Sequence, residues 1–119
     1  MSDLVFGAKQ PYEAYYVEFD FVNDIADEDS ISSATVVAKN GAIDVTATLT
    51  DVTKQLIDGI ADVTWDAYTD AVKLAAKATV VSVWVMAGTT GVTYVITCQI
   101  VTVDGEKYEA EADLQVLEK

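Results

Sequence analysis

The chain contains no histidine and no arginine, and all of its 7 basic residues are lysines. Without histidine it lacks the commonest general base near neutral pH, the usual member of a catalytic triad and a favoured zinc ligand. Its formal net charge of −13 disfavours binding to DNA or to anionic lipid, whose phosphates attract clustered cations. We therefore expect no nucleic-acid partner and no membrane partner, and most hydrolase and metalloenzyme mechanisms lose an essential group.

Cysteine and long apolar runs are equally scarce. Cys98 is the only cysteine, which excludes an intrachain disulfide. No apolar run approaches the roughly 18 residues that span a bilayer, and no apolar stretch follows a basic N-terminus, so we expect a soluble chain made without a signal. Hydrophobic residues make up 51% of the sequence, which is sufficient for a core that folds by packing alone.

The length of 119 residues fits one domain. Residues 1–14 contain Gly7 and Pro11 and show no hydrophobic period, which is typical of an arm that leads into a domain. Residues 15–119 are expected to form that single domain.

Alternation of apolar and polar residues predicts strands in the first half of this domain. From Tyr15 to Phe21 the odd-numbered positions are aromatic or apolar, as in a half-buried strand. After a polar acidic loop, residues 31–39 are rich in β-formers and end at Asn40-Gly41, a strong hairpin signal. Residues 43–50 alternate again and are predicted to be the partner strand.

Two periods compete within residues 51–77. The positions before Asp66 alternate as in a strand, whereas Trp65, Tyr68 and Val72 have the spacing of a helix. We predict a strand to about Asp66, followed by one short helix or turn.

The last third of the chain contains three clear strand patterns separated by glycine-containing turns. Residues 81–85 and 94–100 alternate, and in residues 108–116 the acidic side chains of Glu109, Glu111 and Asp113 share one wet face. About seven short strands at regular spacing predict an all-β, antiparallel sandwich of two sheets.

The residues from Val83 to Tyr108 carry a more specific combination. Val-Trp-Val is followed by the turn Gly88-Thr-Thr-Gly91, by Tyr94-Val-Ile-Thr and Ile-Val-Thr, and by a second glycine turn before an acidic strand. Together with Tyr16-Val-Glu-Phe-Asp-Phe21 and Ser30-Ile-Ser-Ser-Ala-Thr-Val, this combination resembles the small structural proteins of phages and prophages that are described as tail or fibre-tail adaptors. The resemblance implies an immunoglobulin-like sandwich without enzymatic activity.

Two parts of the sequence depart from that family. Residues 59–77 have no counterpart that we can identify and are interpreted as an insertion. Ala87 stands where the family often has glycine.

Tyr94 and Trp84 are the candidate functional positions on the strands. Tyr94 follows a glycine-rich turn at the start of a strand, as in the tyrosine corner of immunoglobulin-like domains; an ordinary core tyrosine is the alternative. Trp84 is out of phase with Val81, Val83 and Val85. If those valines form the core, the indole lies on the outer face as a candidate interface anchor, unless other segments cover it.

The acidic residues offer a weaker candidate for chemistry. The loop around Asp20, Asp24, Asp27, Glu28 and Asp29 is dense in oxygen ligands, but it has neither the alternation nor the central glycine of an EF-hand. A solvated acidic loop is the favoured interpretation, and calcium binding is the weaker alternative. No metal site and no cofactor is assigned.

Catalytic interpretations have little support from the sequence. Glu109 and Glu111 could suggest the paired acids of a glycosidase, but they alternate on the wet face of one strand. Cys98 is in phase with core residues and has no histidine to activate it, so it is predicted to be a small buried hydrophobe. No residue is assigned a catalytic role.

These observations predict a non-enzymatic structural component of a phage virion, at the tail or the head-tail region. The expected partners are other phage structural proteins and further copies of the chain, through repeated weak contacts. Before assembly the acidic chain would stay soluble in the bacterial cytoplasm. The alternative is an immunoglobulin-like recognition module that binds carbohydrate or calcium, with Trp65, Tyr68 and the loop from Asp24 to Asp29 as its candidate surface.

Overall fold

Strand formation follows the alternating pattern of the sequence along most of the chain. The computed structural model describes residues 4–26, 29–59 and 78–118. Its strands are β1 (Leu4–Val5), β2 (Tyr15–Asp20), β3 (Ile31–Asn40), β4 (Ile43–Asp44), β5 (Leu56–Gly59), β6 (Ala78–Val85), β7 (Thr93–Thr102) and β8 (Lys107–Gln115). Two short helical segments lie between β4 and β5, namely α1 (Thr46–Leu49) and the 3-10 turn η1 (Val52–Lys54).

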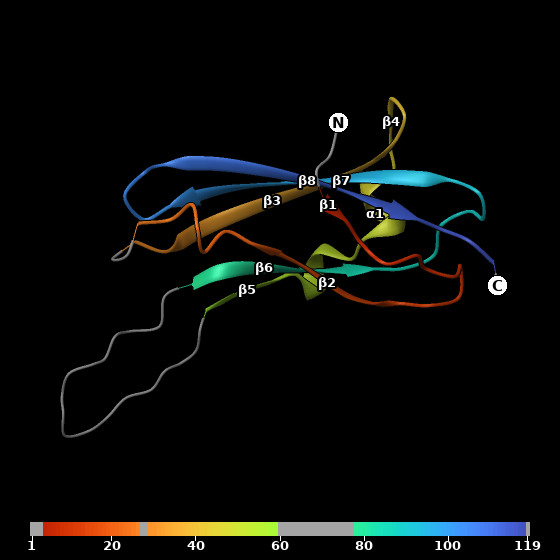
Figure 1. Ribbon diagram of the computed structural model, residues 1–119, viewed down its shortest axis with the longest axis horizontal. Coiled ribbons are helices and arrows are strands. Elements are labelled where there is room, and N and C mark those ends of the chain that lie inside the picture. Colours follow the sequence, from red (N-terminus) through yellow and green to blue (C-terminus); the bar gives the residue numbers. More distant parts are fainter. Residues whose placement is uncertain (1–3, 27–28, 60–77, 119) are drawn as a thin grey trace, which may run out of the picture.

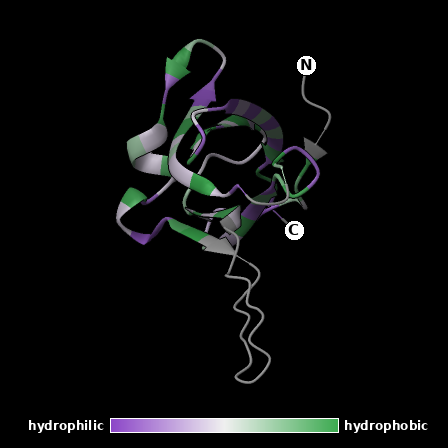
Figure 2. Cartoon of the chain, turned by 90° about the vertical axis from the view of Figure 1, so that its left-hand side faces the viewer, coloured by the Kyte–Doolittle hydropathy of each residue, from purple (hydrophilic) through white to green (hydrophobic). Residues whose placement is uncertain are grey.

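The strands form two layers, which confirms the predicted β-sandwich (Figure 1). One sheet has the order β1-β8-β7-β3-β4, and the other has the order β2-β6-β5. Neighbouring strands are antiparallel, except that β1 runs parallel to β8. Figure 2 looks at the sandwich from one end, with hydrophilic and hydrophobic residues following one another along the strands.

The core lies between the two sheets and is built from the faces that the alternation predicted. Phe19, Val81, Ile96, Cys98 and Leu114 are completely buried. At roughly 1.5–3 kcal/mol for each fully buried large apolar side chain, this layer is the main stabilising contribution. The same register places the residues between these positions on the outer faces of the sheets.

The predicted strand at residues 43–50 is wrong beyond Asp44. Only Ile43 and Asp44 pair with β3, and Thr46–Leu49 forms a single helical turn. The cause is local: Asp44 Oδ1 accepts hydrogen bonds from the backbone N–H and the hydroxyl of Thr46, at 2.9 and 2.7 Å. The Thr46 hydroxyl oxygen in turn accepts the Ala38 N–H at 2.9 Å. These side-chain hydrogen bonds compete with the backbone hydrogen bonds between β3 and β4, so the pairing of the two strands stops after Asp44.

The helical turn still contributes to the core, because Leu49 is buried beneath it. The predicted alternation at residues 61–67 and the predicted helix or turn after Asp66 lie outside the described residues. Within the described residues, η1 and β5 occupy the stretch from Val52 to Gly59.

Residues 4–9, in the segment expected to be an arm, lie along β8. Leu4 and Val5 pair with Ala112 and Asp113. The Phe6 ring packs edge-on against Phe19, with the ring centroids 5.3 Å apart. The N-terminal segment therefore extends the larger sheet by one short parallel strand. Within the described ranges, no helix is long and apolar enough to cross a membrane.

Candidate interface on the three-stranded sheet

Trp84 lies on the outer face of the three-stranded sheet. It belongs to β6, where Val81, Val83 and Val85 point into the core and are at most 2% exposed. Side chains alternate along a strand, so the indole points the other way. Trp84 pairs in register with Tyr16 of β2, and the two rings meet edge to face with centroids 4.9 Å apart. This geometry is favourable for an aromatic pair.

Lys54 covers the other part of the indole. Its Nζ lies 4.3 Å from the centre of the Trp84 ring, within the range of a cation–π contact. The Tyr16 hydroxyl donates a hydrogen bond to the Lys54 carbonyl at 2.9 Å. We call Tyr16, Lys54 and Trp84 the Trp84 cluster. Two strands and a 3-10 turn therefore converge on one half-buried tryptophan.

The position of Lys54 is set by the 3-10 turn that carries it. Asp51 caps this turn, because its Oδ1 accepts hydrogen bonds from the Thr53 hydroxyl at 2.6 Å and from the Thr53 N–H at 3.0 Å. The pKa of Asp51 is lowered chiefly by the hydrogen bond from the Thr53 hydroxyl, then by the hydrogen bond from the Thr53 N–H and by the positive charge of nearby Lys54. The cap is therefore ionised at neutral pH and stabilises the turn. The Asp51 N–H donates a hydrogen bond to the Trp84 carbonyl at 3.2 Å, which joins the start of the turn to β6.

Exposed apolar side chains extend this surface. Leu56 pairs with Ser82, which lies in the outer row together with Trp84, and Leu56 is 49% exposed. Val52 of the 3-10 turn is also exposed, at 61%. The arrangement offers aromatic rings, aliphatic surface and one cation, which together suit a protein partner.

Tyr94 is buried at the turn between β6 and β7. Its phenol oxygen accepts a hydrogen bond from the Thr89 N–H at 2.8 Å, which joins the first residues of β7 to the turn.

Gly88 has φ +98, and a Cβ built there would lie 2.8 Å from Val116 Cγ2. Ala87 has a left-handed φ of 54°. This conformation favours glycine and is strained for alanine.

Lys9 is a buried lysine that sequence reasoning missed. Its side chain is inaccessible to solvent, and its Nζ donates hydrogen bonds to the carbonyls of Gln10, Pro11 and Ala87. Burial lowers the pKa of Lys9, whereas the carboxylate of Glu13 opposes this shift. Lys9 thereby ties the N-terminal segment to the β6–β7 turn. No feature of the sequence around it predicts this contact.

The acidic loop does not assemble a metal site within the part of the chain that the structure describes. There, no group of three or more potential ligands among His, Cys, Asp and Glu comes together. Asp24 is exposed, and Asp27 and Glu28 lie outside the described residues. Trp65 and Tyr68, the aromatic residues of the carbohydrate hypothesis, also lie outside them.

Asp29 has a structural position instead. It is buried, and its Oδ1 accepts hydrogen bonds from the N–H groups of Ser30 at 2.9 Å and Asp104 at 3.1 Å. The neighbouring Thr102 hydroxyl contributes most to lowering the pKa of Asp29, followed by backbone N–H groups. The other carboxylate oxygen, Oδ2, is buried and has no hydrogen-bond partner among the described residues. Asp29 thus fastens the acidic loop to the β7–β8 turn.

The positions considered for catalysis have ordinary structural surroundings. Cys98 is a free, fully buried thiol, and burial raises its pKa to about 12. A thiol with this pKa stays protonated at neutral pH and is a poor nucleophile. Glu109 and Glu111 lie on the outer face of β8, where Glu109 accepts a hydrogen bond from Gln99 at 2.7 Å.

The comparison with protein families assigns the chain. Residues 42–115, more than half of the sequence, match the family described as podophage GP4 fiber-tail adaptor protein gp77. The matched range includes residues 59–77, for which the resemblance identified no counterpart, and it leaves out the first two long strands. A search of curated proteins found no match. The chain belongs to this family of podophage fibre-tail adaptor proteins.

Proposed function

We propose that the chain is a virion component at the tail or head-tail region that joins other phage structural proteins through the outer face around the Trp84 cluster. The family membership supports the adaptor role. The observation that carries the choice of surface is the half-buried Trp84 between Tyr16 and Lys54, beside exposed aliphatic side chains.

The physical basis is the cost of leaving this surface in water. Tryptophan and tyrosine contribute large contact areas at little conformational cost and are enriched among the residues that dominate binding energy. Lys54 is already placed over the indole, and its cation–π contact strengthens when a partner removes water. The partner therefore binds a preformed cluster and orders few side chains.

The proposed assembly includes further copies of the chain. Symmetric structures repeat one contact many times, so each interface can be weak while the whole is stable. With a net charge of −13, free copies repel one another, which keeps the chain soluble in the bacterial cytoplasm until a partner neutralises that charge. We further propose that Tyr94 acts as the tyrosine corner of the sandwich, and that the chain has no enzymatic activity.

The test is the incorporation of variants into phage particles. Trp84→Ala should lower the amount of the chain in purified particles about tenfold or more, because hot-spot truncations cost about 2 kcal/mol or more. The matched control is Tyr12→Ala, an aromatic side chain that is 98% exposed outside the cluster. It should be incorporated normally.

Thermal unfolding separates this interpretation from a folding defect. If Trp84→Ala unfolds within a few degrees of the wild-type chain yet is absent from particles, the interface is supported. Normal incorporation of a stable Trp84→Ala chain would remove this face from the proposal. A large loss of thermal stability would make Trp84 a structural residue.

A further inference from the structure

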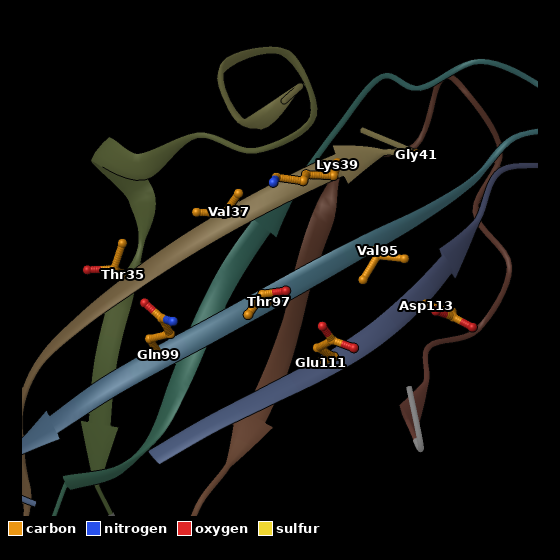
Figure 3. A pocket seen from close by; sticks show the side chains of 9 residues that line it. All are labelled: Thr35, Val37, Lys39, Gly41, Val95, Thr97, Gln99, Glu111 and Asp113. Carbon is orange, nitrogen blue, oxygen red and sulfur yellow. The ribbon is translucent and has the colours of Figure 1, made fainter. Parts of the chain in front are cut away.

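A second surface of the sandwich lies on the five-stranded sheet, opposite the Trp84 cluster. There, β3, β7 and β8 enclose an open hollow of about 600 Å³ on their outer face. Figure 3 shows side chains from all three strands around it, with Lys39 and Gly41 at one side and Glu111 and Asp113 at the other. We call it the β3–β7–β8 hollow.

Short side chains form the floor of this hollow. Val37 pairs with Thr97, and Lys39 pairs with Val95, so valine and threonine occupy the middle of the sheet face. Val37, Val95 and Thr97 are half-buried on the face of the five-stranded sheet that points away from the other sheet of the described residues. The long polar side chains that line the hollow, Lys39, Gln99 and Glu111, lie around these short side chains (Figure 3). The floor therefore leaves a partly apolar trough.

One rim of the hollow is acidic. Glu111 and Asp113 of β8 line it, two positions and about 6.8 Å apart along the strand. Glu111 pairs with Thr97 of the floor, so its carboxylate borders the trough. On the opposite rim, Lys39 is the only cation among the described residues that line the hollow. The potential along the β8 side is therefore negative.

We propose that the β3–β7–β8 hollow binds an extended basic segment of a different protein. Such a segment would place lysine or arginine along the β8 rim and small or branched apolar side chains on the floor, at alternate positions. A second copy of this chain fits poorly, because its net charge is −13 and it contains no arginine. Charge complementarity selects a basic partner.

This inference rests on the proposed adaptor function and deepens it. An adaptor joins two components and needs two contact surfaces. The Trp84 cluster and the hollow lie on the outer faces of different sheets, so two partners can be bound without competing for one surface.

The test uses the full chain and a defined probe. The probe is a blocked decapeptide of alternating lysine and threonine, and the control peptide has glutamate in place of lysine. Backbone amide shifts are recorded by NMR during titration. We expect the largest shifts at Val37, Thr97 and Glu111 with the lysine peptide, and no saturable shifts with the glutamate peptide. Raising NaCl from about 50 mM to about 500 mM should weaken binding, since screening shortens the reach of the rim charges.

Matched variants locate the contact. Glu111→Lys should weaken binding of the lysine peptide about fivefold, and Glu111→Gln, which keeps the side-chain size, should weaken it less. Glu18→Lys makes the same charge change on an exposed residue of the other sheet and should leave the affinity nearly unchanged. Unfolding curves of all three variants establish that they fold.

Four outcomes overturn the inference. One is equal weakening by Glu18→Lys and Glu111→Lys, because binding would then follow net charge alone. The second is saturable binding of the glutamate peptide, and the third is no binding of either peptide. The fourth is concentration-dependent self-association that Glu111→Gln abolishes, which would make a second copy the occupant. The amount of wild-type chain in purified particles is scored separately, since its absence there refutes the adaptor function whatever the peptides do.

Discussion

The buried lysine of the N-terminal segment gives the sharpest stability prediction. Replacing Lys9 by alanine removes the outer methylenes of its stem and the ammonium group that donates to three carbonyls. Three buried methylenes at about 0.8 kcal/mol each amount to about 2.4 kcal/mol. Hydrogen bonds from a charged donor add to this loss, but the desolvation that lowers the pKa of Lys9 offsets part of their contribution.

We therefore expect Lys9→Ala to lower the free energy of unfolding by about 3 kcal/mol, which is a decrease in Tm of about 10 °C for a chain of this size. Lys9→Met retains an apolar stem and should cost only about 1 kcal/mol. Urea denaturation followed by tryptophan fluorescence measures both variants. Lys107→Ala, an exposed lysine on β8, is the control and should stay within about 0.5 kcal/mol of wild type.

Two results would contradict the proposed role of the Lys9 side chain. If Lys9→Ala is as stable as the Lys107→Ala control, the segment is not tied to the sandwich through this side chain. If Lys9→Met loses as much stability as Lys9→Ala, the hydrogen bonds and not the stem are responsible, and the area argument is wrong. Hydrogen exchange at Phe6 and Leu117, whose N–H groups bond to Asp113 and Lys9 carbonyls, should accelerate in Lys9→Ala.

The remaining predictions concern a turn, a thiol and a buried carboxylate. Ala87→Gly should stabilise the chain by about 0.5–1 kcal/mol in thermal unfolding, because φ 54° strains alanine; a loss of stability would contradict this. The stability advantage of wild type over Cys98→Ala should shrink by about 1.4 kcal/mol per pH unit above about pH 9, because the folded pKa is raised to about 12 while the unfolded thiol ionises near 9. A pH-independent difference in urea titrations would show that the folded thiol is accessible. The pKa of Asp29 is lowered in the folded chain. The contribution of its carboxylate to the free energy of unfolding should therefore be complete above the unfolded pKa near 4 and should disappear as the pH falls through the folded pKa. A stability difference between wild type and Asp29→Asn that stays constant during an acid titration would exclude this.

Alternation was sufficient to predict the sandwich where one face of a strand meets the core. The register of β7 with β8 places Ile96 opposite Ala112 and Tyr94 opposite Leu114, as the two alternating patterns require. Period and face are local properties of the sequence, so they can be read without knowing the partner strand.

Prediction failed where side chains bond to nearby backbone. Residues 43–50 alternate like a strand, yet Asp44 and Thr46 form hydrogen bonds that turn the chain after two paired residues. The free energies of the two alternatives differ by about the strength of one or two hydrogen bonds. Such a small difference cannot be resolved from a hydrophobic pattern.

The candidate site could be predicted only in part for a related reason. The phase of β6 placed Trp84 on the outer face. The contacts of Tyr16 and Lys54 with Trp84 depend on the pairing of β2 with β6 and on the position of the 3-10 turn. Both join residues that are far apart in the sequence, and no repeating sequence pattern indicates them. Lys9 is the extreme case, because the carbonyl of Ala87 that it reaches lies far away in the sequence. Tertiary structure alone creates these environments.

Immunogold electron microscopy of purified particles, with an antibody against this chain, tests directly whether the chain is a component of the virion tail. We expect label at the tail or at the junction of tail and head. Label over the capsid would contradict the adaptor role and make the chain a head component. The absence of label on both intact and disrupted particles would contradict any structural role in the virion.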